Sequence, residues 1–345
     1  MLGKRSSLLL ATAHLDEKAI ESRTPPHCRI GHPQPLQWHD ATDGLLAFSL
    51  ELPQDPLADV RAIVPCLSST APEYAYCFYL EAFFADGLIA CALSPIGNFP
   101  AKSLPPTGGE TASPHIEPQI DIFSVRSAPQ TAVLTVYVST PDREAFKSRP
   151  ALVSVSMQGP HPGDIRPNLS LPQEVDIPVP AKSQMQEDEE IAHRICSPTS
   201  VSMVLDSFGR TTEPRELARR AYHQGSDLYG VWPANIHAAS RWDTLGYLLH
   251  FPSWQAALYL LGQGLPLIAS LRYQSGELSR AAAPKTNGHL LVVRGCRDGL
   301  IEVNDPAAPT AASVPRQYDA VEFATVWLGR SALGYVLFPV ENARL

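Results

Sequence analysis

The sequence has little charge and no excess of positive charge. Lys and Arg number 27 against 35 Asp and Glu, and the formal net charge at pH 7 is −8. Proteins that bind nucleic acid or an anionic membrane surface gather lysine and arginine, and this sequence does not. We therefore expect no nucleic-acid partner. The hydrophobic content of 44% in 345 residues is typical of a globular protein with a sizeable core.

Long apolar runs are also missing. No stretch reaches the roughly 18 residues that a membrane helix needs, so no transmembrane segment is expected. Residues 1–18 begin with basic residues, but their apolar core, LLLATA, is shorter than the roughly 7–15 residues of a secretory signal. We interpret this segment as a frayed or surface stretch, with a truncated export signal as the alternative. A cytoplasmic location is favoured, and secretion or a place in the cell envelope is left open.

The six cysteines form no CxxC pair and show no Cys/His spacing suited to zinc. We therefore expect no metal site, and the sequence calls for no organic cofactor. Scattered thiols are typical of a reducing compartment, although Cys66, Cys77 and Cys91 could pair in an exported protein.

The chain changes character near residue 180. Before that point, short apolar runs with partial alternation are separated by clusters of Pro, Gly and Ser. These runs are 45–52, 74–84, 88–95, 131–140 and 150–157. The pattern predicts an all-β accessory domain over residues 1–175, a sandwich or jelly roll. The proline-rich stretch 168–184 is the expected linker to a second domain.

Residues 176–345 show helical patterns first and strand patterns afterwards. Helices are expected at 196–209, 212–223, 232–246, 253–264 and 319–329, and strands at 266–273, 288–296, 300–306 and 333–340. A helical lobe followed by an antiparallel sheet is an α+β domain.

Cys196 begins the first of these helices, in the run CSPTSVSMVLDSFG. A helix N-terminus presents unpaired N–H groups and a partial positive charge, which lower the pKa of a thiol placed there. Pro198 in the first turn suits a helix start. Cys196 is therefore a candidate nucleophile, and the alternative is a small buried hydrophobe.

Two candidate partners follow in the second half. His289 stands at the start of one strand and Asp305 at the end of the next, and an Asp298-Gly299 turn joins the two strands. Antiparallel pairing through that turn places roughly residue 290 opposite residue 306, so the two side chains can meet. A donor for an oxyanion is available from Gln184 or Gln186 just upstream of Cys196, and we prefer Gln184.

The runs CSPTSVSMVL, GVWPANIHAA and TNGHLLVVRGCRDGLIEVNDPAA resemble those of bacterial papain-like cysteine peptidases related to the bacteriocin-processing peptidases, the peptidase C39-like family. The resemblance covers residues 180–345. It implies a papain-like fold with Cys196 as nucleophile, His289 as general base and acid, Asp305 as the residue that orients the histidine, and Gln184 as oxyanion donor.

The resemblance also suggests Trp232 and Asn235 as residues near the substrate groove, and Gly288, beside the histidine, is a further candidate. Relatives usually carry an aromatic residue just before the cysteine, where this sequence has Ile195.

The sequence thus predicts a cysteine peptidase or amide hydrolase that acts on a peptide or protein. Two alternatives stay open. An acyltransferase or transglutaminase-like enzyme would use the same triad, and an inactive scaffold would bind glycan or protein through its N-terminal β domain.

Overall fold

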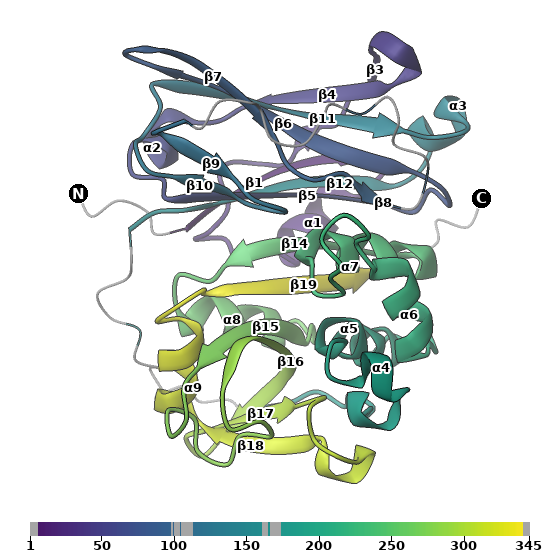
Figure 1. Cartoon of the computed structure of the whole chain (residues 1–345), viewed down its shortest axis with the longest axis vertical. Coiled ribbons are helices and arrows are strands. Elements are labelled where there is room, and N and C mark those ends of the chain that lie inside the picture. The colour runs from purple at the N-terminus through teal and green to yellow at the C-terminus, as the bar shows by residue number, and fades with distance from the viewer. Residues whose placement is uncertain are drawn as a thin grey trace.

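The computed structural model describes residues 6–97, 99, 104, 113–160, 165 and 174–340. Residues 168–173, part of the expected linker, lie outside the described residues. The N-terminal half stacks two sheets face to face, and the C-terminal half combines one sheet with a group of helices (Figure 1).

Within the described residues, each of the two N-terminal sheets has six strands. The first has the order β2-β1-β12-β5-β10-β9, and the second has β3-β4-β11-β6-β7 with β8 paired to β6. The strands of the first sheet are β1 (Ser6–Ala13), β2 (Gln34–Pro35), β5 (Ala62–Ser69), β9 (Ile116–Pro118), β10 (Phe123–Val125) and β12 (Ala151–Gln158). Those of the second are β3 (His39–Asp40), β4 (Leu46–Glu51), β6 (Ala75–Phe84), β7 (Gly87–Ala92), β8 (Ile96–Gly97) and β11 (Thr131–Ser139). The short helices are α1 (Glu17–Ser22), η1 (Thr42–Gly44), α2 (Gln54–Leu57) and α3 (Arg143–Lys147).

The C-terminal half is α+β. Its sheet has the order β14-β19-β15-β16-β17-β18, with β13 paired to β16. The strands are β13 (Val175–Asp176), β14 (Thr244–His250), β15 (Leu267–Tyr273), β16 (Thr286–Arg297), β17 (Leu300–Asn304), β18 (Pro315–Asp319) and β19 (Leu333–Pro339). The helices are η2 (Gln184–Gln186), α4 (Glu189–Ala192), α5 (Cys196–Ser207), α6 (Pro214–Ala221), α7 (Trp232–Ala239), η3 (Ser240–Trp242), α8 (Trp254–Gly262), η4 (Ala311–Ser313) and α9 (Ala320–Trp327). The predicted fold class is confirmed.

The interpretation of the N-terminal segment as a frayed surface stretch is wrong. β1 pairs with β12 along its whole length, from Ser6 opposite Gln158 to Ala13 opposite Ala151. Both faces of this sheet are covered: Leu9 points into the sandwich core, while Leu8 packs with residues of the C-terminal half. A strand buried on both faces has a continuous apolar sequence, which is why LLLATA shows no alternation.

The strand β14 lies at the contact between the two halves and packs on β5 and β12. The backbone of β14 forms hydrogen bonds with buried serines of that sheet. The Ser68 hydroxyl donates to the Gly246 carbonyl at 3.0 Å, and the His250 N–H donates to Ser156 Oγ at 2.9 Å. The predicted helix over 232–246 is wrong in its last part, because α7 ends at Ala239 and β14 begins at Thr244. A continuous apolar run suits a buried strand as well as a helix, and periodicity does not separate the two.

The hairpin of β16 and β17 positions the candidate site. Asp298 and Gly299 both have positive φ, 48° and 77°, as a two-residue turn between twisted strands requires. An irregularity between Val293 and Gly295 shifts the register by one residue, so that Val292 lies opposite Asn304. The pairing ends there, and the same register extended by two residues corresponds to the predicted pairing of residue 290 with residue 306.

Candidate active site

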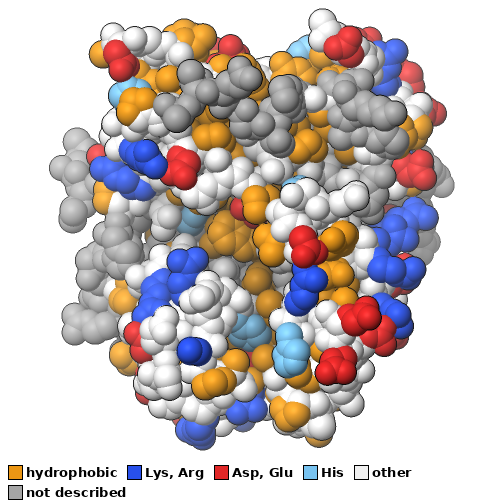
Figure 2. Space-filling view, viewed as in Figure 1, with side chains coloured by type: hydrophobic (Ala, Val, Ile, Leu, Met, Phe, Trp, Pro, Cys, Tyr) orange, Lys and Arg blue, Asp and Glu red, His pale blue; other side chains and the backbone are white. Residues whose placement is uncertain are grey.

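Cys196 is the first residue of α5, a helix whose next nine residues are buried. The preceding residue, Ile195, provides no side-chain cap, so its side chain does not compete with the sulfur for the first N–H groups of the helix. The backbone N–H groups of Ser197 and Leu290 hydrogen-bond the sulfur. The helix packs against β16, which carries Leu290. In Figure 2 the lower half of the molecule is hollowed, and histidine side chains lie on the hollow.

The thiol of Cys196 differs from the other thiols. Burial by itself would raise its pKa, but the hydrogen bond and charge of His289, together with the backbone N–H groups, hold the pKa below the ordinary value. Burial raises the pKa of Cys77 to about 12 and that of Cys91 to about 11. None of the six cysteines, all of which are among the described residues, forms a disulfide. A lowered pKa favours the thiolate, the nucleophilic form.

His289 connects the thiol to a carboxylate. Its Nε2–H donates to Asp305 Oδ1 at 2.8 Å, which leaves Nδ1 as the nitrogen that faces Cys196. His289 is 6% exposed and Asp305 is fully buried. The carboxylate thus fixes both the tautomer and the orientation of the imidazole.

The carboxylate of Asp305 is well supplied with donors. Its Oδ2 accepts from the Tyr318 hydroxyl at 2.7 Å, and its Oδ1 also accepts from the Ala307 N–H at 3.0 Å. Burial by itself would raise the pKa of Asp305, but His289 and these hydrogen bonds hold it below the ordinary value. The acid is therefore charged at neutral pH.

The two negative groups act together on the imidazole. Burial by itself would lower the pKa of His289, but the charge and hydrogen bond of Asp305, followed by those of Cys196, raise it to about 10. The opposite directions of the thiol and imidazole pKa values favour a thiolate–imidazolium pair at neutral pH.

The two candidate oxyanion donors have different surroundings. Gln184 is 4% exposed, and its Nε2 donates to the Ala192 carbonyl at 2.6 Å, in the turn just before Cys196. One N–H of that amide remains for another acceptor. Gln186 is exposed, and its Oε1 accepts from the Ala311 N–H at 3.2 Å.

The three groove candidates lie in different settings. Trp232 is half-buried and begins α7, while Gly288 is exposed beside His289. Asn235 is 1% exposed, and its amide donates to the carbonyls of Tyr229 and Val231 at 2.8 and 2.9 Å. Asn235 thus holds the loop that leads into α7.

Sequence reasoning missed Tyr318, because the short strand β18 was not predicted. Its side chain is buried, and its hydroxyl reaches Asp305 from the strand beyond β17. It also missed the hydroxyl pair of Ser197 and Tyr335, 2.9 Å apart, directly beside the nucleophile. The sequence signal for Tyr318 and for Tyr335 is weak, because each is a single tyrosine within a short run of residues.

Within the described ranges, no group of three or more His, Cys, Asp or Glu side chains is arranged to hold a metal ion. The same residues include no helix with the length and apolar content needed to span a membrane.

Residues 176–335 match the model of the family described as "Peptidase_C39 like family". Among solved structures, the peptidase domain of Streptococcus ComA, a bifunctional ABC transporter of a quorum-sensing pathway, is 16% identical with a TM-score of 0.33, covering 46% of this chain and 98% of that one. A Bacillus anthracis protein described as C39-like is 17% identical with a TM-score of 0.38, covering 49% of this chain and 100% of that one. No curated protein matches the sequence.

Proposed function

From the match of residues 176–335 to the peptidase C39-like family, we propose that this chain is a cysteine peptidase that hydrolyses a peptide or protein substrate through Cys196, His289 and Asp305. Residues 176–345 form the catalytic domain in this proposal, and residues 1–175 form an accessory β domain. The hydrogen-bonded series from Cys196 through His289 to Asp305, at the start of a buried helix, carries the proposal.

The first half of the reaction forms a thioester. The Cys196 thiolate attacks the scissile carbonyl carbon, and the carbonyl oxygen becomes an oxyanion. The Cys196 N–H and the free N–H of the Gln184 amide donate to that oxygen. When the C–N bond breaks, the His289 imidazolium gives its proton to the leaving amine.

The second half releases the product. His289, now neutral, takes a proton from water, and the resulting hydroxide attacks the thioester carbonyl. The C–S bond breaks, the carboxylic acid leaves, and the sulfur returns as thiolate beside an imidazolium. Asp305 keeps the imidazole oriented and stabilises its charged form.

Peptide hydrolysis by the full chain tests this proposal. A mixture of unrelated peptides is incubated with wild type, Cys196→Ala and His289→Ala, and products are identified by mass spectrometry. Hydrolysis by wild type that both variants abolish would support the proposal. Added amines distinguish the acyltransferase alternative, because an acyltransferase would yield amine adducts in place of free acids. Absence of both products, together with a Cys196 thiol that reacts no faster than an ordinary thiol, would refute it.

A further inference from the structure

The helix α7 begins without a cap from its own segment. The residue before it, Val231, has no side-chain acceptor, and Pro233 follows Trp232 in the first turn. The acceptor comes instead from the N-terminal half: Asp121 Oδ2, between β9 and β10, accepts the Trp232 N–H at 3.0 Å. A carboxylate at this end of a helix pairs with an unsatisfied N–H and with the positive end of the helix dipole.

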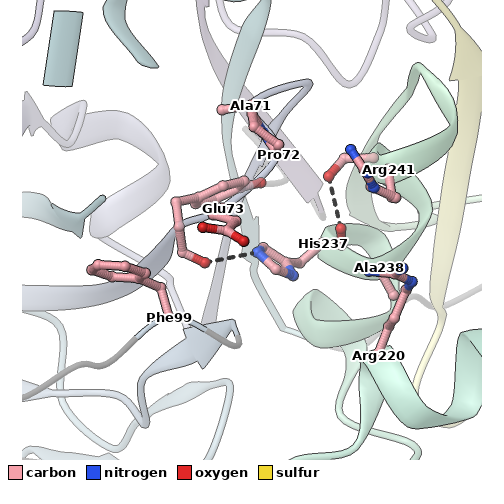
Figure 3. A pocket seen from close by; sticks show the side chains of 10 residues that line it. Ala71, Pro72, Glu73, Phe99, Arg220, His237, Ala238 and Arg241 are labelled. Carbon is pink, nitrogen blue, oxygen red and sulfur yellow. Dashed lines mark hydrogen bonds between the residues drawn. The ribbon is translucent and has the colours of Figure 1, made fainter. Parts of the chain in front are cut away.

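The N-terminal half also holds the last turns of α7. His237 Nε2–H donates to the Tyr74 carbonyl at 3.1 Å, and the two rings lie 4.4 Å apart in an edge contact. Figure 3 shows His237 reaching from α7 toward the loop that carries Glu73. A cavity of about 520 Å³ lies beside this contact and is lined by both halves. Val231 and Ala234 also pack in the apolar core of the N-terminal half, so both apolar and polar contacts attach α7 to that half.

The helix α7 lies against the helix of the candidate nucleophile. Ile236 belongs to the same apolar cluster as Val201 of α5, and both Trp232 and Cys196 pack at the border of that cluster. A displacement of the start of α7 would therefore move apolar neighbours of the Cys196 helix.

Asp121 contributes to the raised pKa of Tyr335, a tyrosine that contacts the Cys196 helix. Its hydroxyl hydrogen-bonds Ser197 Oγ, next to the nucleophile. Burial raises the pKa of Tyr335, and the negative charges of Asp121 and Cys196 add to the effect. The carboxylate of Asp121 thus lies within electrostatic range of the phenol that contacts α5.

Burial disfavours the charged form of Asp121. Burial raises the pKa of this carboxyl to about 6, although the Trp232 N–H and its own backbone N–H lower it. An asparagine would offer an acceptor without a buried charge. The Asp121 carboxylate thus caps α7 in partly buried surroundings where a neutral amide would cap it at a lower desolvation cost.

We propose that Asp121 is a positioning residue for the peptidase reaction, and that through it the β half fixes the start of α7, whose Trp232 is a candidate for contact with the substrate. This inference rests on the proposed function and extends it: the β half is part of the catalytic unit. Asp121 acts through Trp232 and α7, and it does not touch the reacting atoms.

Two alkylating reagents and hydrogen exchange, applied to the full chain, test this inference. Iodoacetamide needs only the Cys196 thiolate, whereas a peptidyl acyloxymethyl ketone must also occupy the groove. We expect Asp121→Ala to slow the peptidyl reagent about tenfold, the effect of losing one helix cap, and to leave iodoacetamide within about twofold. Amide exchange in 231–239 should become faster. Asp121→Asn, which keeps an acceptor, should fold and show a smaller change in the same direction.

Asp142→Ala is the matched control, because Asp142 caps the exposed helix α3 of the same half, accepting the Ala145 N–H at 3.0 Å. Asp142→Ala should leave the rate of Cys196 alkylation by each of the two reagents unchanged. Unchanged exchange in 231–239 would show that Asp121 does not cap α7. Faster exchange with equal effects on both reagents would reduce Asp121 to a structural residue. Either result overturns the inference. A wild-type Cys196 that is unreactive toward both reagents refutes the proposed function instead, and exchange then still decides the capping role.

Discussion

Asp305→Asn would remove a charge from the candidate site and keep its shape. The Oδ1 of the substituted amide can accept from His289 and from the Ala307 N–H, and its N–H can donate to the Tyr318 hydroxyl. The hydrogen-bond geometry can therefore persist. What disappears is the negative charge that keeps the imidazole protonated.

The size of the effect follows from the pKa of His289. That pKa stands at about 10 against an ordinary value of 6.5, and each tenfold change in proton affinity corresponds to about 1.4 kcal/mol, so the two negative partners, after offsetting the opposing effect of burial, favour the imidazolium by a net of roughly 5 kcal/mol. If Asp305 supplies half of this, its neutralisation weakens proton binding to His289 by roughly 50- to 100-fold. The imidazolium then stabilises the thiolate less, and the pKa of Cys196 rises.

The assay is the rate of Cys196 alkylation by iodoacetamide between pH 5 and 9, with the labelled residue located by mass spectrometry. Wild type should stay reactive well below about pH 8.5, the ordinary pKa of cysteine. In the variant the midpoint should move up, and the rate at pH 7 should fall by roughly one to two orders of magnitude. Asp319→Asn is the control, because Asp319 caps α9 and Asn is an equally good cap. A pH profile that Asp305→Asn leaves unchanged would refute the reasoning.

Three further predictions concern the site and the contact between the halves. Gln184→Ala should lower kcat for peptide hydrolysis by roughly 100- to 1,000-fold, whereas Gln186→Ala should leave it nearly unchanged; equal losses would contradict the assignment of the oxyanion donor. Tyr318→Phe removes a donor to a buried carboxylate and should lower the free energy of unfolding, measured by urea titration, by about 1.5–3 kcal/mol. An unchanged free energy of unfolding would show that this hydrogen bond does not contribute to stability. Burial lowers the pKa of His250 from 6.5 to about 3, so His250 takes up a proton near pH 6.5 in the unfolded chain but not in the folded chain. The free energy of unfolding should therefore fall as the pH drops from 6.5 toward 3. The dependence of Tm on pH should be weaker in His250→Gln than in wild type.

Local patterns made part of this molecule predictable. The α5 helix follows from its apolar spacing, its proline in the first turn and the glycine, Gly209, that follows its end. The hairpin that brings His289 near Asp305 follows from the chemistry of the Asp298-Gly299 turn. These features depend on residues close together in the sequence, where elementary rules apply.

The remainder depends on partners far away in the sequence. β1 lacks alternation because each of its faces meets a different part of the chain, and Tyr318 reaches the carboxylate from a strand with a mostly polar sequence. The Trp232 N–H is capped by a residue 111 positions earlier. No local window contains both members of such a pair, so tertiary packing decided these features.

The face of the first N-terminal sheet that packs on β14 is uncovered for part of the time in which the chain is synthesised. Leu8, Leu10 and Leu152 pack with β14 and its neighbours, and β14 ends at residue 250. Once β12 is complete at residue 158, a ribosome adding about 5–20 residues per second needs roughly 5–20 s to make the strand that covers this face. During that time the nascent chain carries an apolar sheet surface open to chaperones and to other nascent chains. An N-terminal fragment released at residue 175 would keep that surface permanently and should aggregate.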